Sequence, residues 1–308
     1  MSFSNLGKDF LRIQKGQGKR AETLRYDKEL IEPIINYFTG KGINDFDHLK
    51  RSDVYDYIDY MRDVKQNSET TINKRIAMLK RLIRFSINED NQAITPDLSK
   101  ILQIEKSKVK VNSKHTLTKS EIGELIKFYD GIKTTSFRGL RLKVILGICL
   151  CCGFRFNEVR NIEKNNISIS DKTIKLTFTK TGKPRYGHLT EELATYIQQF
   201  IDEYNNNSNN IYLITDYDGN QLSMNGLVKI LQRLTNKLNI KISICGLRHT
   251  FASYLLMNGA DIESLRRLMG HTRLTTTQIY LDGISDEHVV TQYELSNIFA
   301  NKQKYATI

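Results

Sequence analysis

The sequence contains no tryptophan, only three prolines in 308 residues, and no apolar run long enough to cross a bilayer. No secretory apolar segment follows Met1, so we expect a cytoplasmic protein that does not contact a membrane. The scarcity of proline and the lack of a long glycine or serine tract argue against extensive disorder. Hydrophobic residues make up 40% and charged residues 26% of the chain, as in folded globular proteins. The length favours two domains.

Cysteine is also sparse, and the sequence has no C-x-x-C pair with a partner pair. Three of the four cysteines, Cys149, Cys151 and Cys152, lie within the apolar run 144–153, and the fourth is Cys245. A zinc site made of paired C-x-x-C motifs is therefore excluded, and reduced thiols are expected. The chain has no tight cluster of Asp and Glu of the kind that two-metal nucleases use. We expect no metal and no cofactor.

The charge balance, in contrast, is strongly positive. The net charge is +12 and the isoelectric point is near 9.4. Residues 1–110 carry 21 basic and 16 acidic side chains, and residues 111–308 carry 25 and 18, so both halves are cationic. A field of this size favours a polyanion such as nucleic acid. A Lys- and Asn-rich composition of an AT-rich genome gives the same balance, so composition alone leaves both interpretations open.

Hydrophobic periodicity and turn signals predict a chain that is mainly helical. In the first half, helices are expected over 21–40, 47–61 and 70–88. In the second half, the capping-box sequence 118–121 opens a helix, and 138–152 is strongly apolar. Short alternating runs predict a small hairpin or three-stranded ribbon, and further helices follow. The expected strands are 167–170, 173–179 and 186–189, and the later helices are 223–237 and 285–300.

The most informative stretch is 245–281, in which an Arg-His pair, a Gly-His pair and a tyrosine follow one another. Tyr280 stands nine residues after His271 and 32 residues after Arg248. This spacing predicts that the three side chains converge on one point. An arginine and a histidine can bind an oxyanion while a tyrosine attacks, which is what phosphoryl transfer to tyrosine requires.

A second motif is G-F-R-F-N-E at 153–158. Arg155 follows a helix break, so its bidentate guanidinium can reach a phosphate. Glu158 lies one helical turn further on and can fix the local geometry. Taken alone, this pattern is also typical of a surface salt bridge.

Together these motifs resemble those of the tyrosine recombinases, also called the phage integrase family. The family pattern H-x-L-R-H-[ST]-F-A corresponds to residues 245–252, L-G-H to 269–271, and T-T-x-x-Y to 276–280. The first arginine box, G-x-R-x-x-E, corresponds to 153–158. Residues 180–189 resemble the family's β-hairpin, whose first lysine, Lys180, takes the place of the catalytic lysine. Lys183 is the nearest rival for that assignment.

The resemblance implies a fold, mainly α with a small β-sheet (α+β), and a two-domain organisation. Residues 1–110 would form a helical core-binding domain of the SAM-like type, and 111–308 the catalytic domain, as in Xer-like members. It also implies a site-specific recombinase that cleaves and rejoins double-stranded DNA at paired half-sites. The implied catalytic residues are Arg155, Lys180, Arg248, His271 and Tyr280, with Glu158 in support.

One position departs from the family pattern. Cys245 stands where the first histidine of the box is usual, and cysteine is smaller and a weaker hydrogen bonder. We therefore expect a slower enzyme, in which His249 either takes over part of the role or is a structural histidine. Rival tyrosines are Tyr186, Tyr254 and Tyr293, and Tyr254 is expected in the core.

Several alternatives remain open at this point. A type IB topoisomerase and a resolvase of hairpin ends share the fold, although length and spacing favour a recombinase. A catalytically weakened DNA-binding regulator is the alternative from another class, and Cys245 is its only support. The family also implies a homo-tetramer in the synapse, with monomers when free. Its terminal helix, here 285–300, then docks into a neighbouring protomer, or it packs on its own domain.

The helix expected over 70–88 carries a basic face without acidic residues, opposite its apolar face. Lys74, Arg81 and Arg84 lie on that face, and Lys80 lies at its edge. Given the DNA implied by the second half, we expect these four residues to meet phosphates. A solvated charged face is the alternative.

Overall fold

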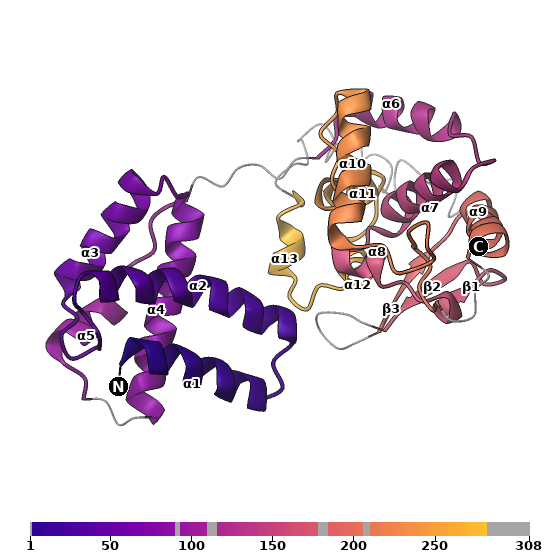
Figure 1. Ribbon diagram of the computed structural model, residues 1–308. Coiled ribbons are helices and arrows are strands. Elements are labelled where there is room, and N and C mark those ends of the chain that lie inside the picture. The colour runs from indigo at the N-terminus through magenta and orange to yellow at the C-terminus, as the bar shows by residue number, and fades with distance from the viewer. Residues whose placement is uncertain (1, 90–92, 110–115, 178–183, 206–209, 282–308) are drawn as a thin grey trace, which may run out of the picture. The chain divides into compact units, whose positions relative to one another are not determined.

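The structure is a computed structural model that describes residues 2–89, 93–109, 116–177, 184–205 and 210–281. The chain divides into two compact units, Met1–Asn112 and Ser113–Ile308 (Figure 1). Lys180, Lys183, Tyr293 and the helix expected over 285–300 lie outside the described residues.

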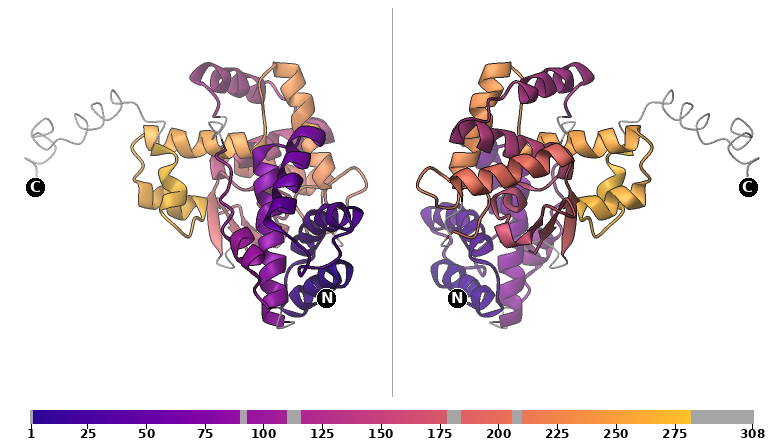
Figure 2. Two further views of the ribbon diagram at one scale, coloured as in Figure 1. Left: turned by 90° about the vertical axis from the view of Figure 1, so that its left-hand side faces the viewer. Right: turned by 90° about the vertical axis from the view of Figure 1, so that its right-hand side faces the viewer.

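The first unit is helical in its described part. Helices α1, α2 and α4 pack on one another, and the shorter α3 and α5 complete the unit (Figures 1 and 2). Phe38, Tyr57 and Ile83 are fully buried at its centre. The helix expected over 47–61 begins instead at Arg51 and continues as one turn of π-helix. The bounds are α1 Phe3–Gly16, α2 Ala21–Gly40, α3 Arg51–Asp59, η1 Tyr60–Val64, α4 Glu69–Glu89 and α5 Pro96–Leu102.

The second unit is built around α7, which contains the segment that the sequence predicts to be a strongly apolar helix. This helix packs against α9, α11 and the last strand of the sheet. Ser136 caps its N-terminus, accepting a hydrogen bond from the amide of Gly139 at 3.2 Å. The helices are α6 Lys119–Asp130, α7 Phe137–Cys152, α8 Phe156–Arg160, η2 Lys164–Asn166, α9 Glu191–Tyr204, α10 Met224–Leu238, α11 Ile244–Met257, α12 Ile262–Met269 and α13 Thr275–Gln278.

The expected three-stranded ribbon is present as an antiparallel sheet in the order β1-β2-β3, with strands Ile167–Ser168, Thr173–Leu176 and Arg185–His188. Thr173 pairs with His188, and Leu176 pairs with Arg185. Side chains alternate along a strand, and β3 accordingly buries Arg185 and Gly187 while it exposes Tyr186 and His188. The mainly helical fold with a small sheet is thus confirmed.

The cysteines of α7 are free thiols, as expected. Cys149 and Cys152 are buried, and Cys151 is half-buried. Burial raises the pKa of the Cys149 thiol to about 12, because a thiolate loses its hydration there. Among the described residues, no helix is both long and apolar enough to span a membrane.

Candidate active site

The G-F-R-F-N-E motif folds as a break between two helices. Gly153 ends α7 in the left-handed conformation, with φ of 56°, and a Cβ there would lie 2.3 Å from the Phe251 ring. Arg155 then caps α8, and its backbone amide donates to Oε2 of Glu158 at 2.7 Å. Only glycine suits both the conformation and the close approach. The break therefore turns Arg155 out of the apolar helix at a defined position.

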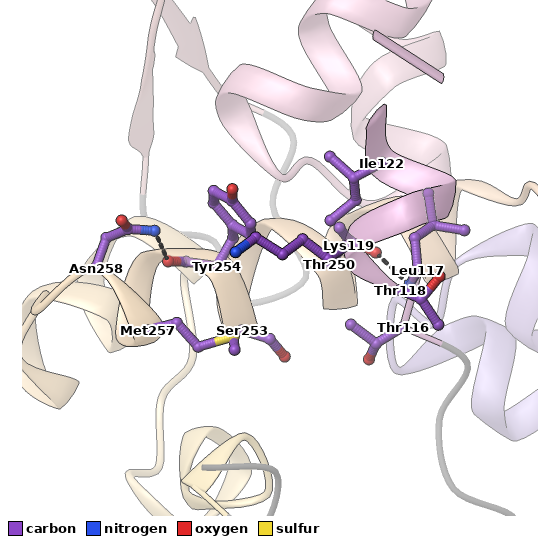
Figure 3. Close-up of a pocket in the computed structure, with 10 residues that line it drawn as sticks. All are labelled: Thr116, Leu117, Thr118, Lys119, Ile122, Thr250, Ser253, Tyr254, Met257 and Asn258. Carbon is purple, nitrogen blue, oxygen red and sulfur yellow. Dashed lines mark hydrogen bonds between the residues drawn. The ribbon is translucent and has the colours of Figure 1, made fainter. Parts of the chain in front are cut away.

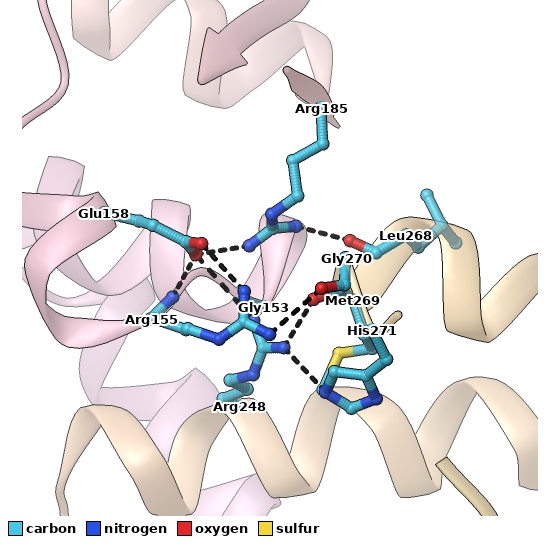
Figure 4. A network of polar contacts seen from close by, with 9 residues as sticks. All are labelled: Gly153, Arg155, Glu158, Arg185, Arg248, Leu268, Met269, Gly270 and His271. Atoms are coloured by element: carbon cyan, nitrogen blue, oxygen red, sulfur yellow. Dashed lines mark hydrogen bonds and ion pairs between the residues drawn. The ribbon is translucent and has the colours of Figure 1, made fainter. Parts of the chain in front are cut away.

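Glu158 is the buried centre of a network that joins three guanidinium groups (Figure 4). Its carboxylate accepts from Arg155 Nη1 at 2.9 Å and from Arg185 Nη2, and Arg248 Nη1 lies 3.9 Å away. Burial favours the neutral acid, but the charge of Arg185 and the hydrogen bonds from both neighbours outweigh it. The pKa of Glu158 therefore lies below its usual value, and the carboxylate keeps the arginines together.

Arg185 is a member of this network that the sequence reasoning missed. Its guanidinium is buried, donates to the carbonyl oxygen of Leu268, and lies 4.8 Å from the centre of the Phe154 ring. Burial lowers the pKa of Arg185, and the charge of Glu158 opposes that shift. The alternation of β3 was the available signal, because it places residues 185 and 187 on the inner face.

Arg248 reaches the site from the first turns of α11. It donates to the carbonyl oxygens of Gly153 at 2.5 Å and Met269 at 2.6 Å, and its Nη2 lies 3.1 Å from Nε2 of His271. Burial, followed by the charges of Arg155 and Arg185, lowers the pKa of Arg248 to about 10. The residue remains a cation at neutral pH, and it ties the end of α7 to the end of α12.

The Gly-His pair forms the turn that ends α12. Gly270 adopts φ of 62°, and a Cβ there would lie 2.6 Å from Cδ of Arg185. His271 follows, with Nδ1 2.9 Å from Oγ1 of Thr277. An arginine cannot accept a hydrogen bond, so Nε2 of His271 is the acceptor from Arg248 and Nδ1 carries the proton. This pairing fixes the ring in one tautomer.

Tyr280 comes from the segment after α13 and is buried against the same cluster. Its ring lies parallel to that of His271, with centroids 6.4 Å apart and an interplanar angle of 5°. Its hydroxyl oxygen lies 3.0 Å from Nδ1 of His249. Burial raises the pKa of Tyr280, while the charges of Arg248 and Arg155 act in the opposite direction. The structure thus brings together Arg248, His271 and Tyr280, as their spacing predicts, and Arg155 joins them through its hydrogen bond to the carbonyl oxygen of Gly270.

Cys245 and His249 also lie at this site. Sγ of Cys245 is 3.4 Å from Nε2 of His249, one helical turn further along α11. His249 is therefore in direct contact with both Cys245 and Tyr280.

The expectation that Tyr254 lies in the core is wrong. Tyr254 is 46% exposed, and it lines a separate cavity of about 460 Å³ between the start of α6 and the last turns of α11 (Figure 3). The helical periodicity places residue 254 on the α11 face that points away from Arg248. Tyr186 is exposed on β3.

In the first unit, the four basic residues of α4 differ in their contacts. Arg81 forms two 3.0 Å hydrogen bonds with buried Asp27, and Lys80 donates to the carbonyl oxygen of Ile104. Lys74 is exposed, with Nζ 5.9 Å from the centre of the Tyr26 ring, and Arg84 is exposed. The helical face contains no acid of its own, but Asp27 reaches it from α2, which the sequence did not indicate.

Comparisons with known proteins agree with this arrangement. The chain matches the Phage integrase family over residues 115–285 and the phage integrase N-terminal SAM-like domain over 8–90. Tyrosine recombinase XerD of Listeria innocua serovar 6a is 26% identical over 283 residues, covering 88% of this chain and 90% of that protein. Tyrosine recombinase XerC of Bacillus pumilus is 27% identical over 281 residues and covers 88% of each chain.

Solved structures show the same fold. XerH site-specific recombinase bound to a palindromic difH substrate superimposes with a TM-score of 0.73 at 18% identity, over 97% of this chain and 85% of that one. The Tn1549 transposon integrase in complex with transposon right end DNA superimposes with a TM-score of 0.72 at 18% identity, over 96% of this chain and 99% of that one.

Fold, site and relatives define a tyrosine-type site-specific recombinase. The chain belongs to the phage integrase family.

Proposed function

We propose that this recombinase cleaves and rejoins double-stranded DNA through a 3′-phosphotyrosyl intermediate on Tyr280. The observation that carries the proposal is the convergence of Arg155, Arg248, His271 and Tyr280 in one cluster. The charges of Arg248 and Arg155 favour the ionised form of Tyr280, and the ring of His271 lies parallel to that of Tyr280. This combination suits the spread negative charge of a phosphodiester in transit.

The roles follow from the chemistry of each group. Arg155 and Arg248 bind the non-bridging oxygens of the scissile phosphate, since a guanidinium matches phosphate geometry. His271 forms a hydrogen bond with the phosphate when DNA is bound. Glu158 holds the arginines in place. Lys180 protonates the leaving 5′-oxygen, and Lys183 is the alternative donor. With these cations in place, the reaction needs no metal.

Each strand exchange is a pair of transesterifications. The Tyr280 oxygen forms a bond to phosphorus as the bond to the 5′-oxygen breaks, and the leaving oxygen takes up a proton. The 5′-hydroxyl of a second strand then attacks the phosphotyrosine, which releases the tyrosine. One phosphodiester bond replaces another, so the energy of the broken bond is retained and ATP is not required.

The two halves of the chain would hold DNA together. In this proposal residues 1–110 form the core-binding domain and 111–308 the catalytic domain, and both carry net positive charge. Lys74, Lys80, Arg81 and Arg84 contact phosphates from the first half. Four protomers assemble on paired half-sites in the synapse, whereas the free protein is a monomer. The match to an N-terminal SAM-like domain over 8–90 supports this division.

A covalent trapping assay tests the proposal. Wild type, Tyr280→Phe and Cys245→His are incubated with nicked duplexes tiled across the DNA that flanks the gene, and products are separated on denaturing gels. We expect an adduct in wild type that disappears in Tyr280→Phe and increases in Cys245→His.

Two outcomes count against the proposal. An adduct that persists in Tyr280→Phe means that another residue is the nucleophile. Tight binding in a native gel without an adduct in any variant favours the DNA-binding regulator, which none of the matches above supports.

A further inference from the structure

His249 lies between the proposed nucleophile and Cys245, which stands where the family pattern has histidine. Its Nδ1 is 3.0 Å from the hydroxyl oxygen of Tyr280, and its Nε2 is 3.4 Å from Sγ of Cys245. His249 and Tyr280 are 8% and 7% exposed, whereas Cys245 is at the surface. Thiol, imidazole and phenol thus form a continuous row that leads from solvent to the buried phenol.

We infer that His249 accepts the hydroxyl proton of Tyr280 during strand cleavage, and that Cys245 holds the His249 ring in the tautomer that this transfer requires. The inference rests on the proposed function and assigns the proton acceptor for it. The position where the family pattern has histidine is occupied by a thiol, and the imidazole one helical turn later contacts the phenol directly.

The proton balance of the step is simple. The O–H bond of Tyr280 breaks and the proton moves to Nδ1 of His249, which becomes an imidazolium. The Tyr280 oxygen bonds to phosphorus while the 5′-oxygen leaves with a proton from the general acid. On rejoining, the attacking 5′-hydroxyl returns its proton to the general acid as its oxygen bonds to phosphorus, and the imidazolium returns its proton to the departing Tyr280 oxygen. The residue ends in its starting state, so no further reactant is needed.

The tautomer follows from the two contacts. To accept from Tyr280, Nδ1 must be unprotonated, so the ring proton sits on Nε2. Nε2–H then points at the Sγ of Cys245, which is a weak acceptor as a thiol and a stronger one as a thiolate. Cys245 therefore acts as a positioning residue that keeps the accepting nitrogen turned toward Tyr280.

His271 is the other imidazole near Tyr280, and its contacts argue against the same role. Its Nε2 accepts from Arg248 and its Nδ1 pairs with Thr277. The ring is stacked beside the Tyr280 ring, 6.4 Å away between centroids. The recorded contacts direct both nitrogens of His271 away from the phenol, whereas Nδ1 of His249 meets it.

The charges around the pair come from three elements. Cys245 and Arg248 belong to α11, Arg155 lies at the start of α8, and His271 follows α12. The arginine charges favour the phenolate of Tyr280, and Cys245 opposes it. The arginines remain cations over the whole working pH range, so their charge stays constant while the pH dependence is measured.

The first test reads the tautomer in the full-length wild-type chain by ¹⁵N–¹H correlation of the six histidines. The signal of His249 is identified by its loss in His249→Gln. We expect a proton on Nε2, an unprotonated Nδ1, and a shift of the Nδ1 resonance in Tyr280→Phe. A proton on Nδ1 means that His249 donates to Tyr280, and that result overturns the inference. The measurement is made on wild type, so a variant that fails to fold does not decide it.

The second test is the pH dependence of adduct formation on the nicked duplex that the trapping assay selects. In wild type the rate falls as the pH is lowered, because a protonated imidazole cannot accept the Tyr280 proton. In His249→Gln the rate at pH 7 falls by about 100-fold or more, and it then rises steadily with pH as the phenol ionises unaided. In Cys245→Ala the rate still falls as the pH is lowered, and the rate at pH 7 is reduced by about tenfold or less.

His48→Gln is the matched control, because His48 is an exposed histidine of the first unit that contacts Asp45, and it leaves the rate unchanged. A His249→Gln variant with the wild-type rate and the wild-type acid limb refutes the inference while the adduct itself upholds the proposed function. Complete absence of an adduct in wild type refutes the proposed function instead. The tautomer of His249 then still shows whether its Nδ1 accepts a hydrogen bond from Tyr280.

Discussion

Arg185 of strand β3 and Glu158 of helix α8 form a buried ion pair, with side chains 7% and 4% exposed. The pair joins the sheet to the helix break that presents Arg155. Because the same guanidinium donates to the carbonyl oxygen of Leu268 in α12, one residue connects three elements of the site. A single carboxylate and a single strand residue therefore organise groups from distant parts of the sequence.

Replacing Glu158 with glutamine removes the only charge that compensates this buried arginine cluster within the recorded contacts. Breaking a buried pair leaves an uncompensated charge, so we expect the free energy of unfolding to fall by about 3–5 kcal/mol. Urea denaturation followed by circular dichroism measures it. Glu203→Gln is the control, because Glu203 is exposed and bonds only Gln199 in the recorded contacts, and its effect is far smaller. Equal losses in both variants would mean that the network is not stabilising.

The same pair predicts a pH dependence. The pKa of Glu158 is lowered in the folded chain, so its contribution to stability is present above the unfolded value of about 4.3 and is lost as pH falls through the folded value. The stability difference between wild type and Glu158→Gln should therefore be largest near pH 6 and shrink toward pH 3. Denaturation curves at several pH values measure it, and a gap that is constant with pH would contradict the assignment.

Gly270 and Gly219 allow the effect of a positive φ to be distinguished from the effect of a close neighbouring side chain. Both adopt positive φ, at 62° and 79°, but a Cβ at Gly270 meets Arg185 at 2.6 Å and a Cβ at Gly219 meets nothing within 4 Å. We expect Gly219→Ala to cost about 1 kcal/mol from backbone strain and Gly270→Ala about 2–4 kcal/mol, with reduced adduct formation only in the latter. Thermal denaturation and the trapping assay give both values. Similar behaviour of the two variants would show that contact with Arg185 is unimportant.

The ionisation of Tyr280 depends on the neighbouring cations. Burial raises the pKa of Tyr280 in the DNA-free protein, and Arg248 provides the largest opposing effect. Arg248→Gln should raise that pKa further, because the charge that favours the phenolate is lost. Titration of ¹³Cζ-labelled tyrosine by NMR measures the shift, with the Tyr280 signal identified in Tyr280→Phe. A decrease of the Tyr280 pKa in Arg248→Gln would contradict this electrostatic account.

Arg81 and Arg84 of α4 should behave differently. Arg81→Ala leaves Asp27, which is 3% exposed, without its partner, so we expect a stability loss on the order of 1–3 kcal/mol. Arg84→Ala should leave stability unchanged and weaken DNA binding. The slope of the logarithm of the binding constant against the logarithm of the salt concentration should become shallower by about one. Urea denaturation and binding at several salt concentrations distinguish the two. An unchanged salt slope in Arg84→Ala would remove it from the proposed interface.

Several helices and strands, and part of the active site, could be predicted from the sequence. The apolar character of α7, the cap at Thr118 and the alternation of residues 173–176 depend on short stretches of sequence. The spacing within residues 245–281 likewise predicts that Arg248, His271 and Tyr280 meet. Such features follow from short stretches of chain, because helices and strands repeat on fixed periods.

Only the tertiary structure decided which side chains contact one another across that framework. The burial of Arg185 against Glu158, the pairing of Asp27 with Arg81 and the contact of His249 with Tyr280 join residues 27, 54 and 31 positions apart. The exposure of Tyr254 likewise depends on which face of α11 the other helices cover. Contacts of this kind depend on how whole elements pack, so no local pattern of residues specifies them.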